Sequence, residues 1–246
     1  MNTFSGERRI QRVRYELRWR ELEVASVARV GRNFMSVTFR GEALADFASG
    51  SFDDHIKFII DGPDGEPVRR DYTPRSFSAE RRELTIEYAL HGHGQASTWA
   101  ANASVGQRVA IGGPRGSMIV PLDYDWHLLV GDAAALPAIH RRVEELPAGA
   151  RAFVIVQVEH AEDERHFDTA AQLDVRWVRT PAELAKAVRE LELPAGEGFA
   201  WGGTEAASAR EIRAILADEK GLPNASLRIS AYWKQGASDF HERLEG

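Results

Sequence analysis

The sequence contains no cysteine among its 246 residues. This absence excludes disulfide bonds, thiolate metal sites, cysteine-ligated iron–sulfur clusters and cysteine nucleophiles. Any redox chemistry would therefore come from a bound organic cofactor or from the substrate.

Long apolar runs are also missing. No segment approaches the length of a membrane span, and no apolar stretch of the kind found in export signals follows the arginine-rich N-terminus. The hydrophobic fraction of 43% nevertheless predicts a normal buried core. We expect a cytoplasmic, monomeric protein without membrane insertion.

An overall positive charge is lacking as well. The formal net charge is −6, which argues against a nucleic-acid-binding protein. Arginines do gather near the N-terminus, where they alternate with apolar residues in the manner of a strand. We expect a half-buried strand with one solvated face, and a basic arm for phosphate backbones is the alternative. The residues concerned are Arg8, Arg9, Arg12, Arg14, Arg18 and Arg20, with Val13, Tyr15, Leu17 and Trp19 between them.

The first half of the chain consists of short strand-like segments separated by turn residues. This spacing predicts an antiparallel, Greek-key β-barrel over residues 1–121. The predicted strands are 24–30, 34–39, 55–60, 84–90 and 107–111.

The second half alternates strands with helices, which predicts a doubly wound parallel α/β sheet over residues 122–246, with a short polar tail. We place the boundary at Val120-Pro121-Leu122. The predicted strands are 126–130, 151–158, 174–178, 198–201 and 227–232, and the predicted helices are 136–145, 181–191 and 205–219.

The segment 70–75 (RDYTPR) combines a cation, an aromatic ring and a hydroxyl in an extended stretch. Arg70 can pair with phosphate, Tyr72 can pack on a conjugated ring, and Thr73 can hydrogen-bond the polar edge of that ring. These properties suit a flavin. Taken alone, the segment is more typical of an ordinary amphipathic strand.

Residues 91–99 (HGHGQASTW) form a turn that leads into a helix, where backbone N–H groups can receive a pyrophosphate. The alternative is a loop closed by an N-capping serine. His91 and His93 could also suggest a metal site, but no third ligand has suitable spacing, so we expect no metal.

Residues 128–139 form an apolar strand, a tight turn and a helix that begins near Pro137. This layout is typical of a phosphate or ribose site, although the glycine fingerprint of dinucleotide-binding proteins is absent.

Six motifs in order resemble the siderophore-interacting protein family of ferric-siderophore reductases, a branch of the ferredoxin reductase superfamily. The resemblance extends from about Arg12 to Trp233. The motifs are 53–57 (DDHIK), 70–73 (RDYT), 91–100 (HGHGQASTWA), 113–117 (GPRGS), 131–139 (GDAAALPAI) and 232–233 (YW).

The resemblance implies FAD on the barrel, NAD(P)H on the α/β domain, and reduction of ferric iron inside a siderophore. It implies no catalytic side chain, because a flavin converts hydride transfer into single-electron steps. The chain departs from the family pattern at Ala133 and Ala134, where an acidic residue and a threonine are usual, and its turn at 201–205 is looser. The expected cofactor contacts are Arg70, Asp71, Tyr72, Thr73, His91, Gly94, Gln95, Ala96, Ser97, Trp99, Asp132, Ala135 and Trp233.

Ferric siderophores are often anionic, so we expect basic residues at the substrate entrance. The resemblance assigns Lys57 and Arg115 to this role, with Lys234 and then Arg75 as weaker candidates. The alternatives are that Lys57 extends from a barrel strand to solvent and that Arg115 satisfies turn carbonyls.

Carboxylates after the strand 154–158, beginning with Glu159, favour ribose hydroxyls over a 2′-phosphate and so indicate NADH. Arg165, Arg176 and Arg179 could instead receive the phosphate of NADPH. Two other functions remain open: a flavin-dependent NAD(P)H/ferredoxin oxidoreductase, with ferredoxin as electron partner, and a non-redox siderophore-binding module.

Overall fold

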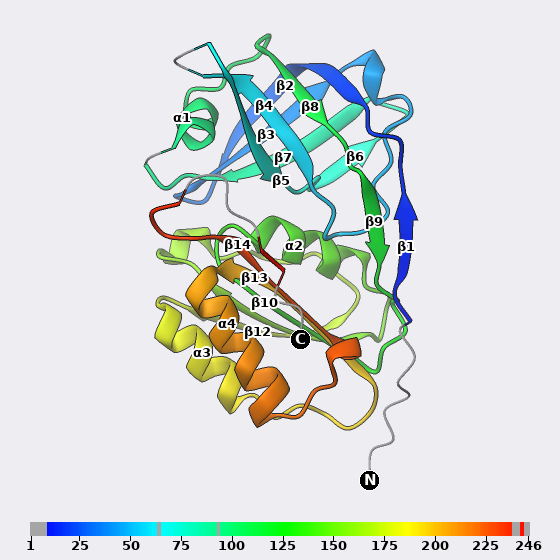
Figure 1. The fold of residues 1–246 in the computed structure, drawn as a ribbon, viewed down its shortest axis with the longest axis vertical. Helices are drawn as coiled ribbons and strands as arrows, with labels where there is room; N and C mark the ends of the chain where they lie inside the picture. The colour runs from blue at the N-terminus through cyan, green and yellow to red at the C-terminus, as the bar shows by residue number, and fades with distance from the viewer. Residues whose placement is uncertain (1–8, 63–64, 93, 238–241, 244–246) are drawn as a thin grey trace. The chain divides into compact units, whose positions relative to one another are not determined.

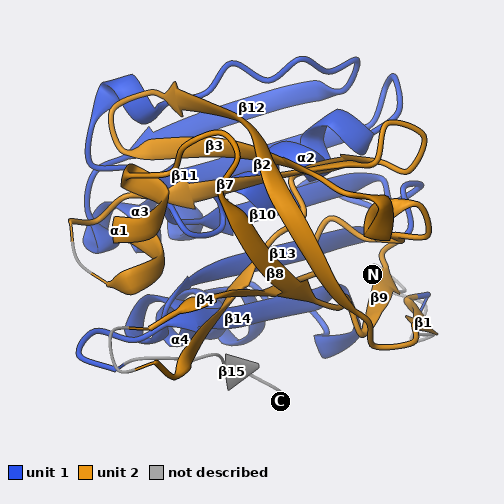
Figure 2. Cartoon of the chain, turned by 90° about the horizontal axis from the view of Figure 1, so that it is seen from above, with its two compact units in different colours: residues 1–9, 121–246 blue, residues 10–120 orange. Residues whose placement is uncertain are grey.

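The structure is a computed structural model that describes residues 9–62, 65–92 and 94–237, and the backbone of 242–243. The chain divides into two compact units, shown in different colours in Figure 2. We call Ile10–Val120 the barrel unit, and Pro121–Gly246 with Met1–Arg9 the α/β unit. Arg9 belongs to the second unit because its guanidinium pairs with Asp123 and with Glu197, the latter at 2.9 Å.

The barrel unit contains a seven-stranded sheet in the order β5-β4-β8-β2-β3-β7-β6. All of its strand pairs are antiparallel, which confirms the predicted fold class. The strands are β2 (Trp19–Val30), β3 (Phe34–Arg40), β4 (Ile56–Asp61), β5 (Pro67–Tyr72), β6 (Ser76–Ser78), β7 (Glu83–Ala89) and β8 (Arg108–Gly112). A short helix α1 (Gln95–Ala101) packs against β3, β5 and β7 (Figure 1).

Alternation along the strands builds the core of this unit, because successive side chains point to opposite faces of a sheet. In β4, for example, Ile56 and Phe58 are fully buried while Lys57 between them is partly exposed. Phe58 lies in an aromatic cluster with Tyr88 (ring centroids 5.2 Å apart) and Trp99 (4.8 Å). Ile59, on the same face as Lys57, is also buried, so the outer face of β4 is exposed only in part.

The N-terminal strand differs from its prediction. β1 (Gln11–Arg14) pairs with β9 (Gly116–Ile119), and all four residues of β1 are exposed. Leu17 and Trp19 are each 58% exposed, whereas Arg20 is 6% exposed. The predicted half-burial is therefore wrong, because in the described chain no further strand pairs with this ribbon. Arg20 is buried instead: it pairs with Asp46 at 3.0 Å and donates to the Ala43 carbonyl.

The α/β unit has a sheet in the order β12-β11-β10-β13-β14-β15. The strands β10 to β14 run parallel, as predicted, and β15 is antiparallel at the edge. The elements are β10 (Trp126–Gly131), α2 (Leu136–Glu145), β11 (Arg151–Gln157), β12 (Gln172–Val178), α3 (Pro181–Glu190), β13 (Gly198–Glu205), α4 (Ala206–Ala214), β14 (Leu227–Trp233) and β15 (Glu242–Arg243). Short 3₁₀ turns occur at Glu42–Leu44, Ala161–Asp163 and Asn224–Ser226, and α4 ends in a π turn, Ile215–Glu219.

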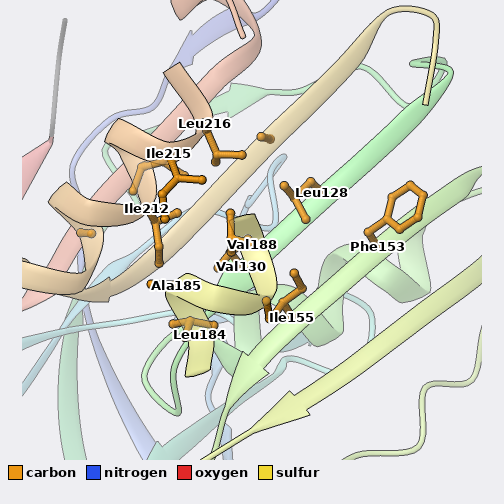
Figure 3. Close-up of a cluster of buried hydrophobic side chains, with 14 of the residues drawn as sticks. Leu128, Val130, Phe153, Ile155, Leu184, Ala185, Val188, Ile212, Ile215 and Leu216 are labelled. Atoms are coloured by element: carbon orange, nitrogen blue, oxygen red, sulfur yellow. The ribbon is translucent and has the colours of Figure 1, made fainter. Parts of the chain in front are cut away.

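Helices cover both faces of this sheet. Leu128 and Val130 of β10 lie in one buried cluster with Leu184 of α3 and Ile212 of α4 (Figure 3). On the other face, Ile139 of α2 lies against Gly131. No helix in the described part of the chain is long and apolar enough to cross a membrane.

Candidate functional site

The segment 70–73 lies at an edge of the barrel sheet, because β5 is the last strand in the order. Its register pairs Arg70 with Phe58 and Tyr72 with Ile56, so Arg70 and Tyr72 share one face of the strand. Asp71 pairs with Lys57 and therefore points to the opposite face. The RDYT segment thus presents two different surfaces.

Two hydroxyl groups of this segment have hydrogen-bonding capacity to spare. The Tyr72 ring packs against Tyr88 (ring centroids 4.4 Å apart), and burial raises the pKa of Tyr72, so its hydroxyl stays protonated. Thr73 is 8% exposed, and its Oγ1 forms no hydrogen bond with any residue that the structure describes. Both hydroxyls can therefore bind a ligand.

The loop 91–99 lies beside this segment, because α1 contacts β5. Gly94 precedes α1 with φ at +84°, a conformation that favours glycine, and no side chain caps the helix. Gln95 is exposed at the first helical position, and Ala96 packs into the barrel core. The structure therefore brings together the two segments that the sequence assigned to a flavin, since the start of α1 lies beside β5.

Two residues of this loop have structural contacts of their own. Ser97 Oγ accepts a hydrogen bond from the His91 backbone N–H at 3.3 Å, which closes the loop. Trp99 stacks on Phe39 in the core, with ring centroids 6.1 Å apart. His93 lies outside the described residues. Among those described, no three His, Asp or Glu side chains form a group that could hold a metal ion.

These groups fit FAD. A guanidinium, two hydroxyls and a helix start without a side-chain cap adjoin one edge strand beside an aromatic cluster. Phosphates require the guanidinium and backbone N–H groups, whereas the ring system requires apolar packing and hydroxyl partners. Arg70 Nη1 donates to the Arg69 carbonyl at 2.7 Å.

Two of the predicted substrate residues belong to the barrel unit: Lys57 lies on β4, and Arg115 lies in the connection between β8 and β9. Lys57 Nζ donates to Asp71 Oδ2 at 2.9 Å, so its charge is compensated within the barrel unit. The other Asp71 oxygen, Oδ1, is buried without a hydrogen-bond partner among the described residues. Arg115 is exposed and forms no ion pair with the rest of the described chain. Lys57 pairs with Gly112 of β8, and Arg115 follows Gly112 by three residues in the sequence. This register places both cations at the same end of the barrel.

A buried hydrogen-bond network that the sequence did not predict fixes this end of the barrel. Asp54, 3% exposed, accepts from Ser49 Oγ at 2.8 Å and from Ser117 Oγ at 2.6 Å. Ser117 Oγ also hydrogen-bonds the Tyr15 hydroxyl at 2.9 Å. Asp54 lies two residues before β4, which carries Lys57, and Ser117 lies two residues after Arg115. The motifs at 53–57 and 113–117 were the available signal, although neither suggested that their residues meet.

In the α/β unit, the predicted residue Asp132 is 6% exposed and is surrounded by donors from the ends of β13 and β14 and from the turn after β10. Its carboxylate accepts from Thr204 Oγ1 at 2.9 Å and from Trp233 Nε1 at 2.8 Å. Burial raises the pKa of Asp132, while these hydrogen bonds act in the opposite direction. Trp233 is 44% exposed.

The turn after β10 is closely packed. A Cβ on Gly131 would lie 2.7 Å from the Cβ of Ala135, and one on Gly203 would lie 3.0 Å from the Tyr232 ring. Ala135 has no exposed surface, whereas Ala134 is exposed. Lys234, the third predicted substrate residue, is exposed near the end of β14.

Comparison with known proteins places the two units in one family. Residues 60–118 match the siderophore-interacting FAD-binding domain, and residues 124–236 match the siderophore-interacting protein family. The chain is 33% identical over 245 residues to the NADPH-dependent ferric-chelate reductase of Escherichia coli, a match that covers 91% of this chain and 96% of that protein.

Two further similarities agree. The ferric vibriobactin reductase ViuB of Vibrio cholerae is 30% identical over 243 residues, covering 87% of this chain and 89% of ViuB. The crystal structure of a siderophore utilization protein from T. fusca superposes with a TM-score of 0.88 at 32% identity, covering 94% of this chain and 98% of that one. The family expected from the motifs is thereby confirmed, and the chain belongs to the siderophore-interacting protein family.

Proposed function

We propose that this chain is an FAD-dependent ferric-siderophore reductase, which passes electrons from NAD(P)H to ferric iron held in a siderophore. The observation that carries the proposal is the set of side chains able to bind a ligand at β5, beside the start of α1. Both elements lie within the segment that matches the FAD-binding domain. The related proteins named ferric-chelate reductase and ferric vibriobactin reductase support the substrate class.

When bound, FAD accepts two electrons from a nicotinamide and releases them singly, so one NAD(P)H reduces two ferric ions. The side chains of this protein bind and orient. Arg70 would hold phosphate, the protonated Tyr72 and Thr73 hydroxyls would meet the polar edge of the ring system, and Gly94 would leave the backbone open to approach. We assign FAD to residues 1–121 and the nicotinamide donor to residues 122–246.

Lys57 and Arg115 would receive the anionic substrate at the end of the barrel. The exposed Arg115 offers a full positive charge, whereas Lys57 must share its charge with Asp71. Arg115 is thus the stronger of the two attractions, and Lys57 becomes available when a ligand competes with Asp71.

The donor preference is a separate proposal, in favour of NADH. Arg179 pairs with Glu164, and Arg176 lies 3.7 Å from Glu190, so both cations are already engaged by carboxylates. Comparing kcat/KM for NADH and NADPH tests this, and a large preference for NADPH contradicts it. In Glu164→Gln, the release of Arg179 should increase the use of NADPH. Ferredoxin as donor, a monomeric state and a cytoplasmic location stay predictions.

The decisive experiment begins with the absorbance spectrum of the purified protein. We expect a flavin spectrum that bleaches anaerobically with NADH or NADPH and returns on addition of a ferric siderophore, with Fe(II) captured by a chelator. A colourless protein that cannot be loaded with FAD would instead indicate a non-redox binding module. Reoxidation by ferredoxin but by no ferric siderophore would favour the ferredoxin oxidoreductase.

A further inference from the structure

Asp132 lies where the order of the parallel strands reverses. β10 is central, with β11 and β12 on one side and β13 and β14 on the other. Open α/β sheets bind their ligands in the crevice beyond the carboxyl ends of the strands at such a reversal. Asp132 directly follows β10 and therefore lies at this crevice.

The Asp132 carboxylate accepts four hydrogen bonds within the protein. Oδ1 accepts from the Ala134 N–H at 2.9 Å. Oδ2 accepts from Thr204 Oγ1 at 2.9 Å, from the Glu205 N–H at 3.0 Å and from Trp233 Nε1 at 2.8 Å. Three donors around Oδ2 leave this oxygen little capacity for a ligand, so its main role is to hold these protein donors.

A β-bulge directs Trp233 toward that carboxylate. Thr204 pairs with Ala231, but the next residue, Glu205, pairs with Trp233, so Tyr232 is the extra residue in β14. A bulge changes the direction of the side chains that follow it. Tyr232 accordingly packs edge-on against Trp201, with ring centroids 6.0 Å apart, while the Trp233 indole reaches across β13 to the end of β10.

Glu205 hydrogen-bonds the backbone that follows Trp233 in the sequence. Its Oε1 accepts from the Gln235 N–H at 3.3 Å, and its Oε2 accepts from the Ala207 N–H at the start of α4. The backbone after Trp233 is thus bonded to the end of β13, whose Glu205 N–H also donates to Asp132. Despite these restraints, Trp233 keeps 44% of its surface exposed.

We infer that Asp132 is a positioning residue: it holds the Trp233 indole at the strand reversal, so that the exposed indole surface can stack on the planar ring of the nicotinamide donor. The inference rests on the proposed function, which supplies that donor. Fixing a side chain before binding removes the entropy cost of ordering it, worth about two- to tenfold in affinity.

The first test measures the indole itself in the FAD-loaded full chain. Of the six tryptophan Nε1–H signals in a ¹⁵N correlation spectrum, Trp233 is identified by the signal lost in Trp233→Phe. We expect slow solvent exchange for this proton and at least about tenfold faster exchange in Asp132→Asn, which has one neutral acceptor oxygen. Exchange as fast as that of a free indole in the wild type would overturn the inference.

The second test is a double-mutant cycle on donor binding. Asp132→Asn should raise the KM and Kd of the preferred nicotinamide donor about two- to tenfold. In the Trp233→Phe background the same substitution should have no further effect, because the residue acts through the indole. Equal losses in both backgrounds would give Asp132 a general structural role and would refute the inference. Arg189→Ala, which breaks an exposed ion pair with Glu219, is the control within the same unit.

The two proposals can fail separately. Should the wild-type protein reduce no ferric siderophore, the proposed function fails. The exchange of the Trp233 proton and the Kd of NADH or NADPH, measured by titration, still decide the role of Asp132.

Discussion

Asp71→Asn should make the protein a better reductase for anionic substrates. In the structure Asp71 Oδ2 accepts from Lys57 Nζ at 2.9 Å, and the two side chains are 27% and 41% exposed. An anionic ferric siderophore that binds Lys57 must displace this partner and also approach a negative charge. Replacing the carboxylate with an amide removes both obstacles while keeping the shape of the side chain.

The magnitude follows from two contributions. A partly exposed ion pair is worth about 0.2–1 kcal/mol, which the ligand no longer has to replace. Repulsion between Asp71 and an anion about 6 Å away, at the dielectric of water and with moderate salt, adds about 0.4 kcal/mol. The sum, about 0.6–1.4 kcal/mol, corresponds to a fall in KM of about three- to tenfold.

Steady-state kinetics with two acceptors measure this effect. Asp71→Asn should lower the KM for an anionic ferric siderophore and leave that for a neutral quinone nearly unchanged, whereas Lys57→Ala should raise only the former. The gain should shrink at high ionic strength. FAD content, determined from absorbance, shows whether the variant still binds its cofactor.

One result would refute the reasoning directly: an unchanged or higher KM for the anionic acceptor in an Asp71→Asn protein that is fully loaded with FAD. Lys57 would then have no part in docking, and the pair with Asp71 would serve only to join β4 and β5.

Three further predictions concern the stability of the α/β unit. Burial lowers the pKa of His127 to about 4, with a further contribution from the positive charge of Arg142. The folded state therefore favours the neutral ring, and the free energy of unfolding should fall by about 3 kcal/mol as the pH falls from 6.5 to 4. Urea unfolding of His127→Gln should show a flatter acid limb, and an identical slope in both proteins would contradict this. Gly198→Ala would place a Cβ 1.9 Å from the buried Trp126 ring, so we expect the free energy of unfolding to fall by about 1–3 kcal/mol or more in the same assay. An unchanged free energy of unfolding would show that the ring can move. Thr180→Ala removes the capping box of α3 and should cost about 1 kcal/mol, whereas Thr180→Ser should be nearly neutral.

Much of the fold was predictable because both units follow simple periodicities. In the α/β unit, the buried run of β10 and the helix that begins at Leu136 were both expected from the apolar pattern and from Pro137. In the barrel unit, β3 and β7 extend to within one residue of their predicted ends. The N-terminal strand was wrong because alternation predicts two faces but does not predict whether anything covers one of them.

The candidate site was predictable only in part, for the same reason. RDYT and the loop at 91–99 could be assigned to a flavin from their chemistry, since cations, hydroxyls and glycines have recognisable roles. The pairing of Lys57 with Asp71 was not predicted, because it depends on the register between β4 and β5. Residues 14 apart become neighbours only when that register is set.

The sequence by itself determined the class of this protein: the absence of cysteine leaves redox chemistry to an organic cofactor or the substrate, the two periodicities predicted two units, and six ordered motifs indicated the family. The tertiary structure decided what individual side chains do. Asp132, Thr204 and Trp233 are separated by up to 101 positions, yet they share one carboxylate oxygen. That contact requires the strand reversal and the bulge in β14, both of which arise from long-range pairing and leave no local pattern in the sequence.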